Sequence, residues 1–217
     1  AAERTIMRTS TGQAPWTIIE GADSRYRDIT VGTIIRDAIR KHLRAAELNA
    51  HVLAETKRKG KTDGADRKKK SAAQPRPKTV LQGLDMSQSL SAKAYEKQMT
   101  EQQGQLNRLI RAAQERGIST LLLFEGWDAA GKGGAIRRLI SALDARAFQI
   151  KQIAAPSDEE RAQHYLWRFW RHLSRAGRIT IFDRSWYGRI LVERVEGFTP
   201  EPAWMRTFCP FFRSARS

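Results

Sequence analysis

The stretch that decides the fold is Leu121-Leu-Leu-Phe124-Glu-Gly126-Trp-Asp128-Ala-Ala-Gly131-Lys132-Gly133-Gly134. Its apolar start predicts an interior parallel strand, and its glycines let backbone N–H groups approach an oxyanion. Apolar positions at 136, 139, 140 and 143 then open a helix whose N-terminus favours negative charge. The spacing G-x-x-x-x-G-K therefore predicts a phosphate-binding loop. Its expected contact residues are Gly126, Ala129, Ala130, Gly131, Lys132, Gly133 and Gly134.

The loop departs from the usual pattern in one residue. Gly133 stands where a Ser or Thr hydroxyl commonly holds Mg²⁺. An acid among phosphate-binding amides repels an anionic ligand unless a cation lies between them. Asp128 is therefore the first candidate for binding Mg²⁺, for orienting the attacking phosphate oxygen, or for both. The alternative is an ordinary turn or N-cap aspartate.

A second acidic site follows the short apolar run over residues 178–182, which ends in Asp183 and Arg184. Ligands of open parallel sheets lie beyond the carboxyl ends of the strands. An Asp at such an end commonly anchors a metal-bound water, so Asp183 is predicted to be the second metal-binding acid, with a helix N-cap as the alternative. Planar guanidinium groups suit phosphate oxygens, which makes Arg184 and Arg189 candidate contacts. For Arg189 a plain surface charge stays open.

The segment between these sites predicts a capped aromatic helix. Ser157 followed by Glu160 is a capping box, and Gly177 ends the pattern. Most of the aromatic and apolar positions at helical spacing are expected in the core. The arginines of the opposite face are expected in solvent, with contact to phosphate as the alternative. The apolar set is Tyr165, Leu166, Phe169, Trp170 and Leu173, and the basic set is Arg161, Arg168 and Arg171.

The remaining pattern alternates helices with strands. A helix is expected over about residues 91–116, and a strand over residues 148–153. This alternation predicts a three-layer α/β fold with a parallel sheet. Upstream, residues 14–20 read as a strand, and residues 29–43 keep one apolar helix face. One strand and one helix cannot bury a core alone.

Composition narrows the class of protein. The chain has 217 residues and a formal net charge of +16, which implies a polyanionic partner such as nucleic acid, an acidic membrane or polyphosphate. The basic run over residues 57–70 contains no aromatic residue, which argues against specific nucleic-acid binding and leaves a solvated tether as the plainer interpretation. No stretch approaches the roughly 20 apolar residues of a membrane helix. Cys209 is the single cysteine, so no internal disulfide forms, which fits a cytoplasmic protein.

The sequence resembles the polyphosphate kinase 2 family in four runs, at residues 124–138 (FEGWDAAGKGGAIRR), 155–156, 165–170 (YLWRFW) and 182–189 (FDRSWYGR). The resemblance extends from about residue 84 to residue 198. It implies a phosphate-loop kinase fold and transfer of a phosphoryl group between inorganic polyphosphate and a nucleotide, with Mg²⁺. Likeness to tandem members implies AMP as the acceptor, giving ADP. It also implies that Asp128 and Lys132 are catalytic loop residues, that Asp183 is the metal-associated acid and that Arg184 contacts polyphosphate. Arg137, in the first run, joins the expected phosphate-binding residues.

The resemblance also suggests a division of the chain. Residues 1–54 resemble the final strand and helix of a preceding domain of this kind, residues 55–80 are predicted to be a basic flexible linker, and residues 81–217 a second domain that is incomplete at its C-terminus. The expected cost of a missing lid is weak or absent turnover. An alternative is that residues 1–54 fold back to complete the second domain.

Three other functions stay open on the sequence. They are an ATP-dependent nucleoside monophosphate kinase, a non-catalytic remnant that binds polyanions, and a nucleic-acid-binding protein. The direction of transfer, the acceptor base and association into a homo-oligomer also stay open.

Overall fold

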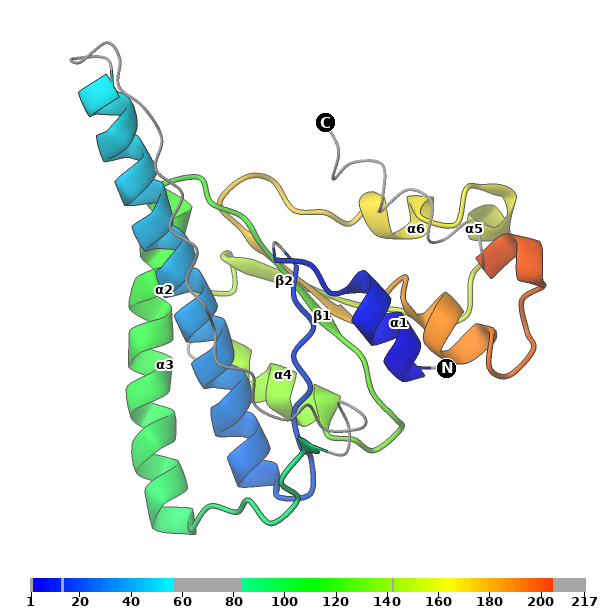
Figure 1. Cartoon of the computed structure of the whole chain (residues 1–217), viewed down its shortest axis with the longest axis horizontal. Helices are drawn as coiled ribbons and strands as arrows, with labels where there is room; N and C mark the ends of the chain where they lie inside the picture. Colours follow the sequence, from blue (N-terminus) through cyan, green and yellow to red (C-terminus); the bar gives the residue numbers. More distant parts are fainter. Residues whose placement is uncertain (1, 13, 57–82, 142, 205–217) are drawn as a thin grey trace, which may run out of the picture.

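Three parallel strands carry the predicted loops: β1 (Thr120–Phe124), β2 (Phe148–Gln152) and β3 (Ile179–Asp183). The computed structural model describes residues 2–12, 14–56, 83–141 and 143–204 (Figure 1). Strand β3, the last of the three in the sequence, lies between the other two. Its register places Phe124 and Gln152 opposite Asp183, so all three strands end at the same edge of the sheet. This edge is where the phosphate loop was predicted to lie.

Helices cover both faces of the sheet, as the prediction of a three-layer α/β fold requires (Figure 1). One face carries α2 (Ser24–Thr56), α3 (Ala92–Glu115) and α4 (Lys132–Ile140). The other carries the short helices α5 (Asp158–Ala162) and α6 (Trp167–Trp170). A π-helical turn, η2 (Arg189–Glu193), packs against α1 (Ala2–Thr9). Within β3, Ile179 and Ile181 face the first layer and Phe182 the second, so the central strand is buried on both sides.

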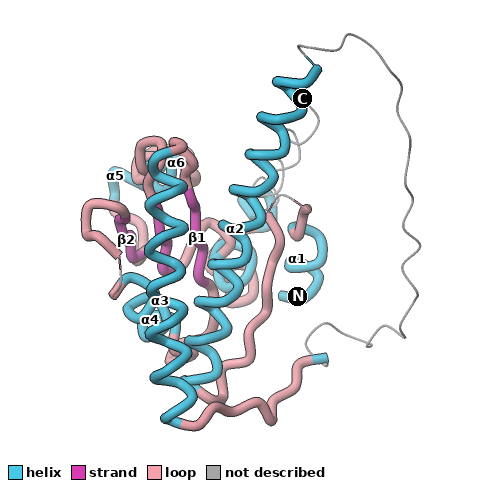
Figure 2. Tube along the Cα trace, turned by 90° about the vertical axis from the view of Figure 1, so that its left-hand side faces the viewer, coloured by secondary structure: helices cyan, strands magenta, loops and turns pink. Residues whose placement is uncertain are grey.

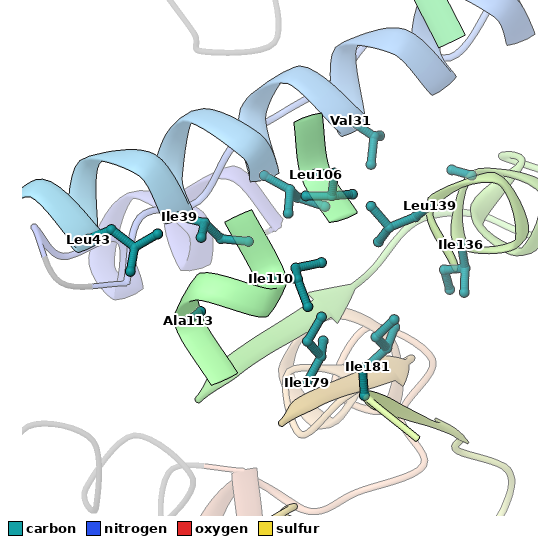
Figure 3. Packing of buried hydrophobic residues seen from close by; sticks show 13 residues of the cluster. Val31, Ile39, Leu43, Leu106, Ile110, Ala113, Ile136, Leu139, Ile179 and Ile181 are labelled. Atoms are coloured by element: carbon teal, nitrogen blue, oxygen red, sulfur yellow. The ribbon is translucent and has the colours of Figure 1, made fainter. Parts of the chain in front are cut away.

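The larger core lies between α2, α3 and the sheet. Apolar residues of α2 recur every fourth position at Val31, Ile35, Ile39 and Leu43, which places them on one helix face. They meet buried residues of α3, and α4 adds Ile136 and Leu139, as Figure 3 shows. Helices α2 and α3 lie side by side in both views (Figures 1 and 2). The buried residues of α3 are Leu106, Ile110 and Ala113.

Several predicted elements are confirmed. The helix expected over residues 91–116 is α3, and the Oγ of its N-cap Ser91 accepts a hydrogen bond from the backbone N–H of Ala94. The capping box of Ser157 and Glu160 is also present, at the start of α5. The upstream apolar helix is α2, which shares its core with α3 and α4. The assignment of residues 1–54 to a preceding domain stays a prediction. Residues 57–80 of the expected linker and the tail from residue 205, with Cys209, lie outside the described residues.

The strand expected over residues 14–20 is wrong, because this segment is a loop. Its backbone bonds locally to the end of α1 instead of to a strand. Ala14 N–H donates to Thr11 Oγ1 over 3.0 Å, and Trp16 N–H donates to Ser10 Oγ over 3.2 Å. Side-chain hydroxyls thus accept hydrogen bonds from two of the N–H donors that a sheet neighbour would have used.

The continuous aromatic helix is also wrong, because the chain leaves the helix after α5. Gln163 is extended, with φ −105° and ψ 168°, and α6 begins only at Trp167. Phe169 is fully buried, whereas Trp170 and Leu173 are about half exposed. The interruption changes which side chains of the segment face the core, so the stripe is only partly buried.

The same interruption turns Arg168 inward, which corrects the expectation of a solvated arginine. Its Nη2 donates to the carbonyl oxygen of Ala154 over 2.7 Å and lies 3.2 Å from Glu160 Oε2. A buried guanidinium needs such partners because an unpaired charge is costly away from water. Arg168 therefore ties α6 to the loop that follows β2.

Across the described ranges, none of the helices combines the length and the apolar character needed to span a bilayer.

Candidate phosphate-binding site

The predicted loop connects β1 to α4 and is open to solvent. Gly131 caps α4 with φ 83°, and Ala129 also has a positive φ of 63°, which is uncommon for a residue with a Cβ. Trp127 is 90% exposed. Since the first N–H groups of a helix lack partners within it, the start of α4 presents donors and a positive dipole end to the loop. The local backbone therefore suits an anion.

The side chain of Lys132 folds back over the loop. Its Nζ donates to the carbonyl oxygen of Gly126 over 2.9 Å and to that of Trp127 over 2.8 Å. An ammonium group has three donors, so these two bonds hold the charge above the loop without using all of its N–H groups. The predicted phosphate-binding lysine thus lies within the turn formed by its own glycines.

Two residues predicted separately are brought together across the sheet edge. The Nη2 of Arg184 pairs with Oδ1 of Asp128, although 56 positions separate them. The Asp128 side chain is 89% exposed, so the pair lies at the surface. Arg184 has a positive φ of 66°, and its N–H donates to the carbonyl oxygen of Phe124 over 3.0 Å. Non-glycine residues held in this region are concentrated at functional sites.

Asp183 lies where the sequence placed it, at the carboxyl end of β3. Its carbonyl oxygen accepts a hydrogen bond from Ile153 N–H over 3.0 Å, which joins the ends of β3 and β2. The N-cap alternative does not hold, because Gly188 precedes the next helical turn. Asp183 and Asp128 thus flank the same edge, from the strand and from the loop.

The donor set fits a magnesium ion bound partly by substrate. The described residues contain no cluster of three or more His, Cys, Asp or Glu side chains that could hold a metal by themselves. Mg²⁺ is commonly bound through one or two carboxylates together with phosphate oxygens and water. Asp128 and Asp183 provide carboxylates of this kind, so the residues present fit the group.

The two remaining candidate arginines belong to the helical segments that follow the two loops. Arg137 is exposed in α4, one turn beyond Lys132. The guanidinium carbon of Arg189 lies 3.5 Å from the ring centroid of Tyr165, and its Nε lies 3.3 Å from Glu193 Oε2. The described contacts of Arg189 are therefore with the aromatic layer, and its proposed role in phosphate binding stays a prediction.

Glu125 is a site residue to which no role was assigned from the sequence. Its Oε1 accepts hydrogen bonds from the backbone N–H of Ser185 over 2.7 Å and from Ser185 Oγ over 2.6 Å. Burial raises the pKa of the Glu125 carboxyl, although the bonds from Ser185 act in the opposite direction. One feature of the sequence could have indicated this role. Glu125 is an acid placed directly between a buried apolar strand and the glycine loop, where a carboxylate needs a hydrogen-bond partner. Glu125 links the start of the phosphate loop to the turn that carries Arg184.

A second connection reaches the loop from α2. The Nη1 of Arg27 donates to the carbonyl oxygen of Ala130 over 3.4 Å, across 103 positions of sequence. No motif marked this arginine.

Comparison with known proteins finds similarity to a single family. The sequence model of the family Polyphosphate kinase 2 (PPK2) matches residues 89–213. A polyphosphate:AMP phosphotransferase of Pseudomonas aeruginosa is 46% identical over 206 residues, which cover 95% of this chain and 39% of that protein. A GDP-polyphosphate phosphotransferase of Mycobacterium tuberculosis is 42% identical over 113 residues, covering 52% of this chain and 38% of that protein.

Solved structures give the same result. A crystal structure of polyphosphate kinase 2 from Pseudomonas aeruginosa is similar with a TM-score of 0.58 and 44% identity, over 96% of this chain and 38% of that one. A polyphosphate kinase 2 from Arthrobacter aurescens has a TM-score of 0.55 and 29% identity, over 60% of this chain and 50% of that one. The chain spans about two-fifths of the length of the first curated relatives that it matches. Because the family model matches more than half of the residues of this chain, the chain belongs to the polyphosphate kinase 2 family.

Proposed function

We propose that this site transfers a phosphoryl group between inorganic polyphosphate and a nucleotide, with AMP converted to ADP as the leading reaction. The observation that carries the proposal is the placement of Lys132, Asp128 and Arg184 around one exposed loop at the carboxyl edge of the sheet. The 46% identity to a polyphosphate:AMP phosphotransferase supports the choice of substrates.

The residues divide the work of phosphoryl transfer, which consists mostly of positioning and charge neutralisation. Lys132 and the first N–H groups of α4 bind phosphate oxygens. Arg184 leaves its surface pair with Asp128 and contacts the transferring group, because a phosphate carries more charge than one carboxylate. Asp128 and Asp183 would hold Mg²⁺, which neutralises phosphate charge when bound.

The function is tested by incubating the purified chain with Mg²⁺, polyphosphate and either AMP or ADP, followed by separation of the products. Asp128→Asn should reduce transfer at least ~100-fold and leave the fold intact. Asp158→Asn is a matched control, since Asp158 also forms an exposed pair, with Arg161 at 2.8 Å, but lies in α5. It should retain the wild-type rate.

The alternatives give different outcomes in the same experiment. Formation of ADP from AMP with ATP, but not with polyphosphate, would indicate an ordinary nucleoside monophosphate kinase. Binding of polyphosphate without transfer by the wild-type chain would indicate a polyanion-binding protein. Reduced turnover, a cytoplasmic location and association into a homo-oligomer stay predictions from the sequence.

A further inference from the structure

We propose that Arg27 is a positioning residue for the phosphate loop and fixes the junction between the loop and α4. The inference rests on the proposed function, because it assigns a role in binding phosphate to a helix outside the loop motif. Arg27 lies in the first turns of α2, more than a hundred positions before the loop lysine.

The first support is the close approach of Arg27 to the last glycine before Lys132. Its guanidinium occupies the space that a side chain on Gly131 would need, so a Cβ there would overlap Nη1 and Cζ. The same guanidinium donates to the neighbouring carbonyl oxygen of Ala130 over 3.4 Å. Gly131 is thus favoured by its φ of 83°, and the guanidinium of Arg27 fills the space beside its Cα.

The second support is a buried carboxylate that holds Arg27 in this position. The side chain of Asp28 is only 1% exposed. Its Oδ1 accepts from Arg27 Nε over 3.2 Å and from Nη2 over 3.1 Å, while its Oδ2 lies 2.9 Å from Arg138 Nε. A buried carboxylate with two guanidinium partners has its charge compensated and its geometry restricted.

The third support is that Arg138 extends this network into two other helices. Arg138 belongs to α4, where its Nη1 donates to the carbonyl oxygen of Gly134 over 3.2 Å. Its Nε also donates to the hydroxyl of Tyr95 in α3 over 2.6 Å. Helices α2, α3 and α4 therefore meet at one ionic cluster beside the loop.

The charge of the cluster also suits an anion-binding role. Two guanidinium groups and one carboxylate leave one net positive charge next to the N-terminus of α4. This charge adds to the positive end of the helix dipole, which favours a bound phosphate. Because the side chain of Arg27 is itself largely buried, we assign it to holding the loop, not to contacting the substrate.

The test combines binding with a spectroscopic signal from the loop. Tripolyphosphate is the probe, and its affinity is measured by titration calorimetry with Mg²⁺. The full chain is labelled with 5-fluorotryptophan, and the ¹⁹F resonance of Trp127 is assigned from the spectrum of Trp127→Phe. Trp127 is a suitable reporter because it is exposed and lies four positions before Gly131.

Arg27→Ala should shift or broaden the Trp127 resonance and weaken tripolyphosphate binding about tenfold, which corresponds to about 1.4 kcal/mol. Arg27→Lys keeps the charge but cannot reproduce the fork to Asp28, so it should recover part of the affinity while the resonance stays displaced. Arg116→Ala is the matched control. It removes a guanidinium that pairs with Glu47 at 2.7 Å, also between α3 and α2 but away from the loop, and should change neither readout.

The inference is overturned if Arg27→Ala folds and matches Arg116→Ala in both affinity and resonance. If Arg27→Ala does not fold, Arg27→Lys decides in the same way: an unchanged resonance and affinity overturn the inference, and a displaced resonance with weaker binding supports it. A wild-type chain that does not bind tripolyphosphate contradicts the proposed function instead. In that case the Trp127 resonance alone still decides whether Arg27 positions the loop.

Discussion

Removal of the Glu125 carboxylate should weaken the link between the phosphate loop and the turn that carries Arg184. In Glu125→Ala the N–H and hydroxyl of Ser185 lose the oxygen to which both donate. Hydrogen bonds to a charged group contribute about 1.5–3 kcal/mol each, and part of this is offset by the cost of burying the charge. We therefore expect the free energy of unfolding to fall by roughly 2–4 kcal/mol.

The measurement is urea denaturation at pH 7, followed by tryptophan fluorescence. Glu159→Ala is the control, since Glu159 is 68% exposed and lies 3.5 Å from Arg171. Exposed pairs of this kind contribute about 0–1 kcal/mol. Equal stability losses in the two variants would contradict the assignment of Glu125 as a link between the loops.

A pH series on Glu125→Gln tests the electrostatic part of the reasoning. Because burial raises the pKa of Glu125 in the folded state, its protonation favours the fold below the ordinary glutamate value of about 4.3. That contribution is lost as the pH rises through the folded-state pKa. Relative to the wild type, Glu125→Gln should therefore become more stable between pH 4 and pH 7. A difference that stays constant, or that changes in the opposite direction, would show that the carboxylate is not disfavoured by burial.

Three further substitutions test the site, the core and the buried arginine. Asp128→Asn should reduce transfer at least ~100-fold in the ADP assay but lower the unfolding free energy by less than ~1 kcal/mol, since only a surface pair is lost; a comparable loss of stability would argue for a structural role. Ile181→Ala, in the fully buried centre of β3, should cost about 2–5 kcal/mol in urea denaturation, and a cost under ~1 kcal/mol would contradict the described core. Arg168→Ala removes a buried guanidinium from the carbonyl oxygen of Ala154 and from the partly buried Glu160, and should cost about 1.5–3 kcal/mol, which a thermal melt with an unchanged midpoint would rule out.

The parts of the fold that could be predicted are those determined by short stretches of sequence. The apolar run before Gly126 and the one before Asp183 were each enough to define a strand, and the positions of their ends followed from the geometry of parallel sheets. The helix from residue 92 followed in the same way from its cap and apolar period. These features depend on neighbours within a few positions.

The errors arise where side-chain hydrogen bonds and ion pairs override a periodic pattern. The aromatic segment has helical spacing throughout, yet Gln163 leaves the helix and Arg168 turns inward to Ala154 and Glu160. The segment over residues 14–20 has the composition of a strand, but hydroxyl groups just after α1 accept hydrogen bonds from the N–H groups of Ala14 and Trp16. Neither arrangement can be read from periodicity.

The candidate site shows the same division. The glycines, Lys132 and Asp128 belong to one motif and were identified together. The pairing of Asp128 with Arg184 and the bonds from Ser185 to Glu125 join segments about 60 positions apart. The sequence placed both segments at the same sheet edge, but it carries no signal of which side chains pair there. Arg27 lies still farther from the loop and belongs to no motif.

The order of the strands has a consequence for synthesis of the chain on the ribosome. Within the described part of the chain, strands β1 and β2 each pair only with β3, which is the last of the three to be translated. At ~5–20 residues per second, the roughly 60 residues between β1 and β3 take about 3–12 s, during which the apolar β1 has emerged before its partner. A nascent chain stalled before residue 179 therefore presents an unpaired hydrophobic strand, which is the state most open to capture by chaperones or to aggregation.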